Sequence, residues 1–121
     1  MALNGNGRRT FFFVSDSTGI TAETIGNSIL AQFEGVKFDG HRIAFVDDRE
    51  KAEAASLRIK TAYAQGGERP IVVNTLVDPS LCEIIAESGA LMIDVLAPFI
   101  GTLELELGRR RSAALNRSHG M

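Results

Sequence analysis

A cluster of small hydroxyl residues follows the first apolar run of the sequence. It reads Ser15-Asp16-Ser17-Thr18-Gly19-Ile20-Thr21 and leads directly into a segment with helical spacing. The unsatisfied N–H groups and the positive dipole end of a helix start suit an anion. Hydroxyl groups can donate to phosphate oxygens, and a glycine lets the backbone approach a ligand closely. We therefore predict a phosphate or anion site formed by Ser15, Ser17, Thr18, Gly19 and Thr21.

The same residue types also allow a purely structural interpretation, because Ser, Thr, Asp and Gly are common in helix caps and turns. Asp16 complicates the anion interpretation. A carboxylate about 4 Å from a phosphate costs on the order of 4 kcal/mol, more than the roughly 0.3–1 kcal/mol that a helix dipole contributes. Asp16 is therefore expected to point away, to hold Mg²⁺, or to act catalytically on a substrate hydroxyl. Glu23, in the first helical turn, is expected to complement the helix dipole.

Other candidate residues give weaker signals. Neither His41 nor His119 has an evident serine or cysteine partner to activate. Cys82, the single cysteine, lies among apolar residues and is predicted to be in the core, so we expect no His/Cys metal site. Asp94 interrupts an apolar strand, where a buried carboxylate needs partners. It is expected either at the end of that strand or in the site.

Common nucleotide-binding motifs are absent from the 121 residues. The sequence has no G-x-x-x-x-G-K-[ST] motif, and Gly5-Asn6-Gly7 precedes the first strand instead of following it. We therefore expect no cofactor-binding site of these two types in this chain.

Apolar runs alternate with helical patterns along the chain. Strands are predicted at residues 11–14, 42–46, 71–77 and 90–96. The first helix carries an apolar stripe from Ala22 to Phe33, and the second is expected to begin with Asp47 and Glu50 as a capping box and to end at Gly66-Gly67. The third begins at Asp78-Pro79 and the fourth at Pro98. This order predicts an α/β fold with three layers: a doubly wound, mainly parallel four-stranded sheet with helices on both faces, of Rossmann or flavodoxin type.

The composition is that of a soluble globular protein, with 45% hydrophobic and 23% charged residues. We expect one domain at residues 11–107, a disordered amino-terminal segment at 1–10 and a polar linker at 108–121, whose Arg109, Arg110, Arg111 and Arg117 are expected to be solvated. A net charge of −2 lacks the basic excess of nucleic-acid-binding domains. Without a signal peptide or a long apolar run, no membrane partner is expected and the protein is predicted to be cytoplasmic.

One stretch of the sequence resembles a known family. Residues Phe12 to Thr24, with Gly26, Gln32 and Phe33, resemble the start of the phosphoenolpyruvate synthase regulatory proteins, which are related to the pyruvate, phosphate dikinase regulatory proteins. Shorter agreements occur at Phe45-Val46, Arg69-Pro70-Ile71-Val72 and Arg117-Ser118-His119-Gly120. The motif Ile20-Thr21-Ala22-Glu23 resembles the synthase regulatory proteins more than the dikinase regulatory proteins.

The resemblance implies a bifunctional serine/threonine kinase and phosphorylase that acts on phosphoenolpyruvate synthase. Such proteins phosphorylate a threonine of the target with ADP as donor, and remove that phosphate with inorganic phosphate as acceptor, releasing diphosphate. ADP or ATP and phosphate are the ligands implied for the full-length family, and a homodimer is allowed. The family's P-loop lies in a carboxyl-terminal domain that this chain does not contain. We therefore expect a truncated form that is inactive alone, because phosphoryl transfer needs a phosphate cradle.

Two alternatives from other classes remain open. Ser17-Thr18-Gly19-Ile20-Thr21 also resembles the phosphate loop of flavodoxins, which would make the protein an FMN-binding electron carrier. Asp16 and the scarcity of Trp and Tyr speak against that alternative. The second alternative is a non-catalytic docking or dimerisation module whose hydroxyl residues only cap a helix.

Overall fold

A computed structural model of the protein describes residues 8–111. Strands and helices alternate along this part of the chain: β1 (Arg8–Val14), α1 (Ile20–Leu30), β2 (Lys37–Ile43), α2 (Arg49–Gly66), β3 (Ile71–Asn74), α3 (Pro79–Ala86), β4 (Leu91–Asp94) and α4 (Ala97–Leu107). The predicted alternation is confirmed in order and in number for these residues.

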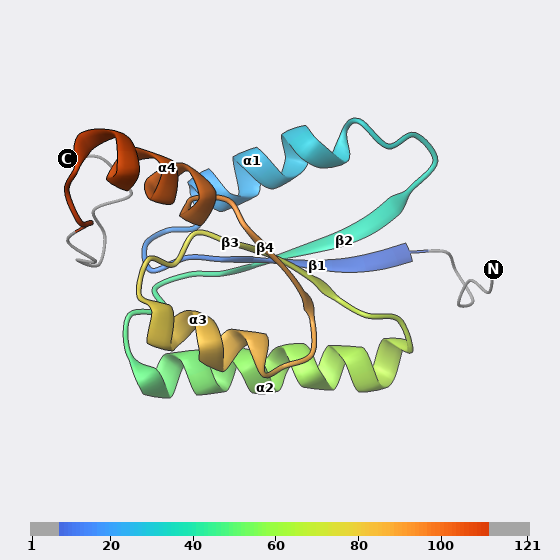
Figure 1. Cartoon of the computed structure of the whole chain (residues 1–121). Coiled ribbons are helices and arrows are strands. Elements are labelled where there is room, and N and C mark those ends of the chain that lie inside the picture. The colour runs from blue at the N-terminus through green and yellow to red at the C-terminus, as the bar shows by residue number, and fades with distance from the viewer. Residues whose placement is uncertain (1–7, 112–121) are drawn as a thin grey trace.

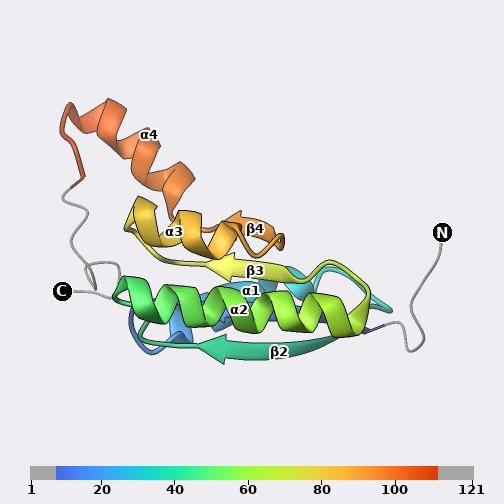
Figure 2. The ribbon, with the colours of Figure 1, turned by 90° about the horizontal axis from the view of Figure 1, so that it is seen from below.

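All strand pairs are parallel, and the strand order in the sheet is β2-β1-β3-β4. Helices α2 and α3 lie on one face of the sheet, and α1 and α4 lie on the other (Figure 1). The view from below shows α2 running along the sheet, with α3 beside it toward β4 (Figure 2). The predicted three-layer α/β class is therefore confirmed.

The core is divided by the central strand β1. Phe12 and Val14 pack into a cluster that includes residues of α2 and α3, whereas Phe11 and Phe13 pack into a second cluster with Ala22 of α1. Successive side chains of a strand point to opposite faces, so a run of four apolar residues supplies both clusters. All four are buried, as the sequence predicts. The strand begins at Arg8, so residues 8–10, predicted to be part of a disordered segment, are strand residues instead.

The second strand differs most from its prediction. It was expected at residues 42–46, where the apolar residues are, but β2 spans Lys37–Ile43 and is largely exposed. An edge strand tolerates polar residues because one of its sides faces solvent. The strand ends at Ile43, and Phe45 has a positive φ of 60°, which is incompatible with a continuing strand.

The prediction that Asp47 caps the second helix is wrong by one residue. Asp48, not Asp47, is the N-cap of α2, and its Oδ1 accepts the N–H of Lys51 at 2.8 Å. Asp47 instead pairs with the Lys51 ammonium group at 2.9 Å. The predicted caps at Asp78 and Gly67 are confirmed.

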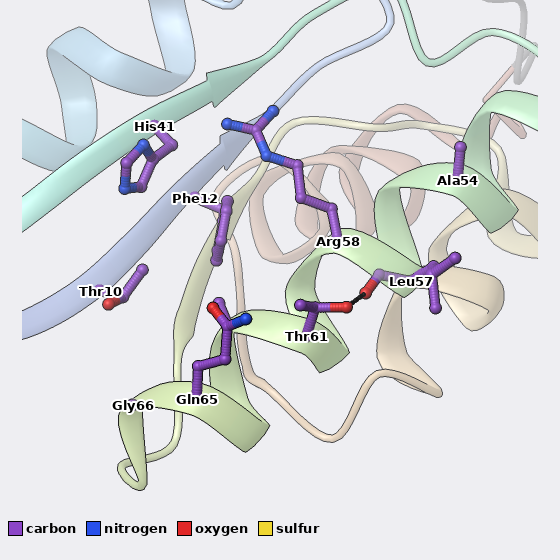
Figure 3. A pocket seen from close by; sticks show the side chains of 10 residues that line it. Thr10, Phe12, His41, Ala54, Leu57, Arg58, Thr61, Gln65 and Gly66 are labelled. Carbon is purple, nitrogen blue, oxygen red and sulfur yellow. Dashed lines mark hydrogen bonds between the residues drawn. The ribbon is translucent and has the colours of Figure 1, made fainter.

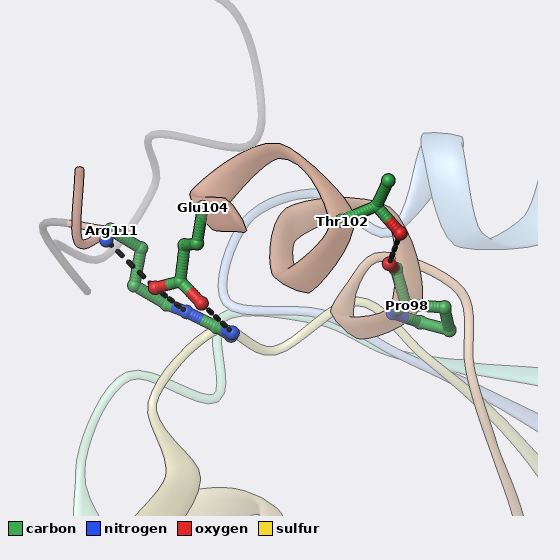
Figure 4. Close-up of polar contacts among 4 residues, drawn as sticks. All are labelled: Pro98, Thr102, Glu104 and Arg111. Carbon is green, nitrogen blue, oxygen red and sulfur yellow. Dashed lines mark hydrogen bonds and ion pairs between the residues drawn. The ribbon is translucent and has the colours of Figure 1, made fainter. Parts of the chain in front are cut away.

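Most other element ends lie inside their predicted limits, although α4 begins at Ala97, one residue before the predicted Pro98. The third and fourth strands are shorter than predicted, ending at Asn74 and Asp94, and α1 ends at Leu30, which leaves Phe33 58% exposed. The chain after α4 folds back, because the Arg111 guanidinium binds the Glu104 carboxylate at 2.9 Å (Figure 4). Residues 112–121, which include Arg117 and His119, lie outside the described residues.

Candidate functional site

The strand order marks one place on the sheet where a ligand is expected. The chain leaves β1 toward β2 on one side and returns through α2 to β3 on the other side of β1. In open α/β sheets, ligands bind beyond the carboxyl ends of the strands at such a reversal. The loop after β1, residues 15–19, and the loop after β3, residues 75–78, lie at this point. Thr75, the first residue of the second loop, donates its N–H to the carbonyl of Val14 at the end of β1 at 3.0 Å.

The predicted hydroxyl residues differ in accessibility. Ser15 is fully buried, and its Oγ accepts the N–H of Ser17 at 3.0 Å. Thr18 is exposed, and Ser17 and Thr21 are half-buried. A ligand that arrives from solvent therefore reaches Thr18, Ser17 and Thr21 before Ser15. The anion site itself stays a prediction.

Helix α1 begins at this loop without a side-chain cap. Its N-cap is Gly19, in the left-handed region with φ 88° and with no side-chain cap hydrogen bond. The first helical bond runs from the Glu23 N–H to the Gly19 carbonyl at 3.0 Å. The nearest hydroxyl contact is long, since Thr18 Oγ1 accepts the Ile20 N–H at 3.4 Å. A glycine at this position suits the left-handed conformation but leaves the helix dipole without a capping oxygen of its own.

Gly19 has a second reason to be glycine. A Cβ placed there would lie 2.6 Å from Cγ of Arg42, whose side chain crosses the loop from β2. The Arg42 guanidinium then donates to Glu23 in the first turn of α1 at 2.8 Å. We expected Gly19 to admit a ligand, whereas the group that approaches it is Arg42.

Arg42 is the residue that the sequence reasoning missed. It brings a guanidinium, a strong binder of phosphate groups, to the start of α1. Its side chain is 43% exposed and that of Glu23 36%. The available signal was its place near the end of a strand, but that strand was predicted to begin at Arg42. Glu23 has the predicted dipole position and in addition neutralises Arg42.

The loop after β2 is joined to the loop after β1 by backbone hydrogen bonds. The N–H of Val46 donates to the Ser15 carbonyl at 2.9 Å, and the N–H of Phe45 donates to the Ser17 carbonyl at 2.8 Å. Phe45 is 54% exposed, so this junction presents an aromatic ring beside the hydroxyl residues. Asp16 lies beneath the surface, 1% exposed, so a ligand from solvent does not contact it in this conformation.

A second polar cluster lies at the ends of β3 and β4. Asn74, which is 2% exposed, donates from Nδ2 to Oδ1 of Asp94 at 2.7 Å, and its Oδ1 accepts the N–H of Leu76 at 3.1 Å. Asp94 thus lies at the end of its strand, held by a buried amide. A cavity of about 250 Å³ adjoins it and is lined in part by Asp94, Cys82 and Arg111.

Cys82 is half-buried in this cluster and not in the centre of the core. Its Sγ lies 3.3 Å from Asn74 Nδ2. Burial raises the pKa of the Cys82 thiol, and the hydrogen bond from Asn74 opposes that rise. A thiol with a raised pKa is a poor nucleophile at neutral pH. Asp78, the cap of α3, has a lowered pKa because the Ser80 hydroxyl donates to it.

A larger cavity, of about 670 Å³, lies elsewhere, between α2 and the face of β1 and β2 that α2 covers. Its lining brings together Phe12, His41, Leu57 and Arg58, with Arg58 positioned over the Phe12 ring at 5.7 Å (Figure 3). Gln65 and Gly66, from the last turn of α2, line one end of this groove (Figure 3), and no residue of the hydroxyl loop is among its lining residues. The groove therefore shares no residue with the predicted anion site.

Two structural observations limit the classes of site in residues 8–111. Within this range, no group of three or more His, Cys, Asp and Glu side chains is arranged to hold a metal ion. None of the helices in the described part of the chain has the length and apolar character needed to cross a membrane.

A family model and individual curated proteins both match this chain, and they point to the same family. The model of a family described as kinase/pyrophosphorylase matches residues 11–121. A protein of Xylella fastidiosa (strain M23), provisionally named a phosphoenolpyruvate synthase regulatory protein, is 58% identical over 113 residues, which are 93% of this chain and 41% of the relative. A protein of Xanthomonas oryzae pv. oryzae (strain MAFF 311018) with the same name is 55% identical over the same shares. The chain thus spans about two fifths of the length of these curated relatives.

Proposed function

The chain belongs to the kinase/pyrophosphorylase family, and on that premise we propose that it is part of a bifunctional regulator of phosphoenolpyruvate synthase. In one direction the regulator transfers the β-phosphoryl group of ADP to a threonine hydroxyl of the synthase, leaving AMP and a phosphothreonine. In the other direction inorganic phosphate attacks that phosphothreonine, so diphosphate leaves and the hydroxyl is restored.

Within this reaction, the part of the chain that we assign to a phosphate group is the loop between β1 and α1. The observation that carries the assignment is the joint placement of hydroxyls and a guanidinium at one helix start. Ser17 and Thr18 lie directly before α1, Thr21 lies in its first turn, and Arg42 reaches the same turn from β2. Hydroxyl donors, a helix dipole and an arginine are three groups that favour a phosphate over a neutral ligand.

The transfer step needs more than this loop. A phosphoryl-transfer site surrounds the moving group with a backbone cradle and compensating charge, and the 121 residues contain no Walker A motif. We therefore assign the transfer chemistry to the additional length of the longer relatives, and the recognition of phosphate and target to this chain.

A direct assay tests this division. The 121-residue chain and the longer Xylella relative are each incubated with phosphoenolpyruvate synthase and ADP, and phosphothreonine on the synthase is quantified by mass spectrometry. We expect phosphothreonine with the relative and none with the chain alone. Transfer by the chain alone would contradict the division, and no transfer by either protein would contradict the proposed activity.

The strand order is also compatible with a flavodoxin-like FMN carrier, because such proteins bind FMN at the same reversal. The family match supports the regulator instead. The flavodoxin-like alternative predicts that the purified protein is yellow and shows flavin absorbance. A colourless protein that does not bind added FMN would remove that alternative.

A further inference from the structure

Phe45 combines a strained backbone with an exposed aromatic ring. Among residues 8–111 it is the one non-glycine residue with a positive φ, 60°. A bulky side chain in this region is a genuine outlier, and such strain collects at functional sites. Its ring is 54% exposed, so much of its apolar surface remains in water. Exposure alone would need no explanation, but a strained backbone that presents a largely solvated ring does.

The strained conformation is fixed by the hydroxyl loop. The N–H of Phe45 donates to the Ser17 carbonyl at 2.8 Å, and the next N–H, that of Val46, donates to the Ser15 carbonyl at 2.9 Å. Val46 is 1% exposed and anchors the chain in the core. The ring of Phe45 is therefore held at a fixed place beside the Ser15–Gly19 loop, while the residue after it points inward.

A second apolar side chain is presented by the hydroxyl loop itself. Ile20, the first residue of α1, is 56% exposed directly after Gly19. A phenyl ring and a branched aliphatic side chain have no hydrogen-bonding groups, so they suit an apolar surface and not the strongly hydrated phosphate. A group that contacts these side chains belongs to a ligand other than the phosphate.

We propose that Phe45 is a substrate-positioning residue that contacts an apolar side chain beside the acceptor threonine of the target protein. This inference rests on the proposed function, because it assigns a protein segment to the same loop. The N–H of Phe45 binds the loop that precedes Ile20, and both side chains are exposed, which suits an apolar side chain of a protein segment. A nucleobase that stacks on the ring is the competing occupant, and the experiment separates the two.

The test compares variants that remove the ring with and without relief of the backbone strain. Phe45→Gly removes both the ring and the strain, whereas Phe45→Ala removes only the ring. Phe33→Ala is the matched control, since Phe33 is 58% exposed and follows the other end of α1. Binding of the 121-residue chain to phosphoenolpyruvate synthase and to ADP is measured by calorimetry, and thermal unfolding is measured for each variant.

We expect Phe45→Gly and Phe45→Ala each to weaken synthase binding about tenfold, as loss of a central aromatic contact does. Phe33→Ala should leave binding unchanged. Phe45→Gly should unfold at a temperature about 4–8 °C above that of Phe45→Ala, because glycine accepts the positive φ. Weaker synthase binding by Phe45→Gly, the more stable of the two variants, would show that the lost affinity does not result from lost folding stability.

Three outcomes would overturn the inference. If the wild-type chain binds the synthase and Phe45→Gly binds equally well, the inference fails while the proposed function stands. If Phe45→Gly loses affinity for ADP and not for the synthase, the ring contacts a nucleobase instead. If the wild-type chain does not bind the synthase, target recognition by this chain fails, and the inference fails with it.

Discussion

Arg42 and Glu23 form an ion pair of 2.8 Å across the buried backbone of Gly19. The pair connects the end of β2 to the first turn of α1, and it occupies the guanidinium that reaches the predicted phosphate site. A phosphate that binds there competes with the Glu23 carboxylate for Arg42. This competition makes the role of each residue measurable.

Removing the competing carboxylate should strengthen phosphate binding. Glu23→Gln leaves Arg42 available, and the loss of an exposed ion pair, worth about 0.2–1 kcal/mol, corresponds to a dissociation constant for inorganic phosphate that falls roughly 1.4-fold to fivefold. Arg42→Ala should raise that constant by at least as much. Both dissociation constants are measured by isothermal titration calorimetry.

The control is Arg49→Ala, which breaks the exposed Arg49–Glu53 pair on α2 and should leave phosphate binding unchanged. Opposite signs for Glu23→Gln and Arg42→Ala are required; equal effects would exclude Arg42 as a phosphate ligand.

Substitution of Gly19 should cost more stability than substitution of a glycine with a similar φ. Gly19→Ala places a Cβ at φ 88° and 2.6 Å from Arg42 Cγ, whereas Gly67→Ala does so at φ 80° with nothing within 4 Å. We expect about 1–2 kcal/mol for Gly67→Ala from the left-handed backbone alone, and about 1 kcal/mol more for Gly19→Ala because the Arg42 pair must shift. Urea unfolding gives both values. In an Arg42→Ala background the two should become equal, and a persistent difference would refute the contact.

Two helical glycines should respond to alanine with opposite signs. A Cβ on Gly26 of α1 would lie 2.4 Å from Cε1 of Phe13, whose ring is 1% exposed and cannot move outward. Gly26→Ala should therefore destabilise by about 1–3 kcal/mol through overpacking. Gly101 of α4 has nothing within 4 Å of its Cβ position, so Gly101→Ala should stabilise by about 0.5–1 kcal/mol through helix propensity. A neutral Gly26→Ala would mean that α1 packs farther from the sheet.

The Glu104–Arg111 contact should appear in the pH titration of one carboxyl group. The Arg111 side chain donates to Glu104, and the Arg111 N–H adds a second bond, which together lower the pKa of Glu104 from 4.5 to about 2 (Figure 4). Because the folded pKa is depressed, the stabilisation is present above pH 4.5 and is lost as the pH falls toward 2. Arg111→Gln should move the pKa of Glu104 back toward 4.5, as read from its carboxyl carbon resonance. Arg109→Gln should leave it near 2, and an ordinary pKa in the wild type would show that this contact does not form.

The sequence was sufficient where local chemistry determines the local structure. The run Phe11–Val14 predicts a strand buried on both faces, and Asp78 followed by Pro79 predicts a helix start, because each signal depends only on neighbouring residues. The fold class follows from the alternation of such elements. The ends of the strands do not, since β2 is polar and its residues 37–43 are strand only because they pair with β1.

The same limit applies to the site. The hydroxyl loop was found because its residues are consecutive, but the burial of Ser15 depends on the loop after β2, which covers it through Val46. Arg42 is separated from Glu23 by 19 residues and reaches it only through the β1–β2 register. The sequence gives no indication that Phe45 is unusual, because phenylalanine is not a residue type that predicts a positive φ.

The most direct test of the central claim is a titration of the ¹⁵N-labelled chain with inorganic phosphate and with diphosphate, followed through its amide resonances. If the β1–α1 loop binds a phosphate group, the amides of Thr18, Gly19 and Thr21 shift with a saturable dependence on ligand concentration, and the Arg42 Nε resonance shifts with the same constant. Amides lining the groove under α2, such as Thr61, stay in place. Unchanged loop resonances at millimolar ligand would contradict the account, and the hydroxyl residues would then be explained by the structure of the turn alone.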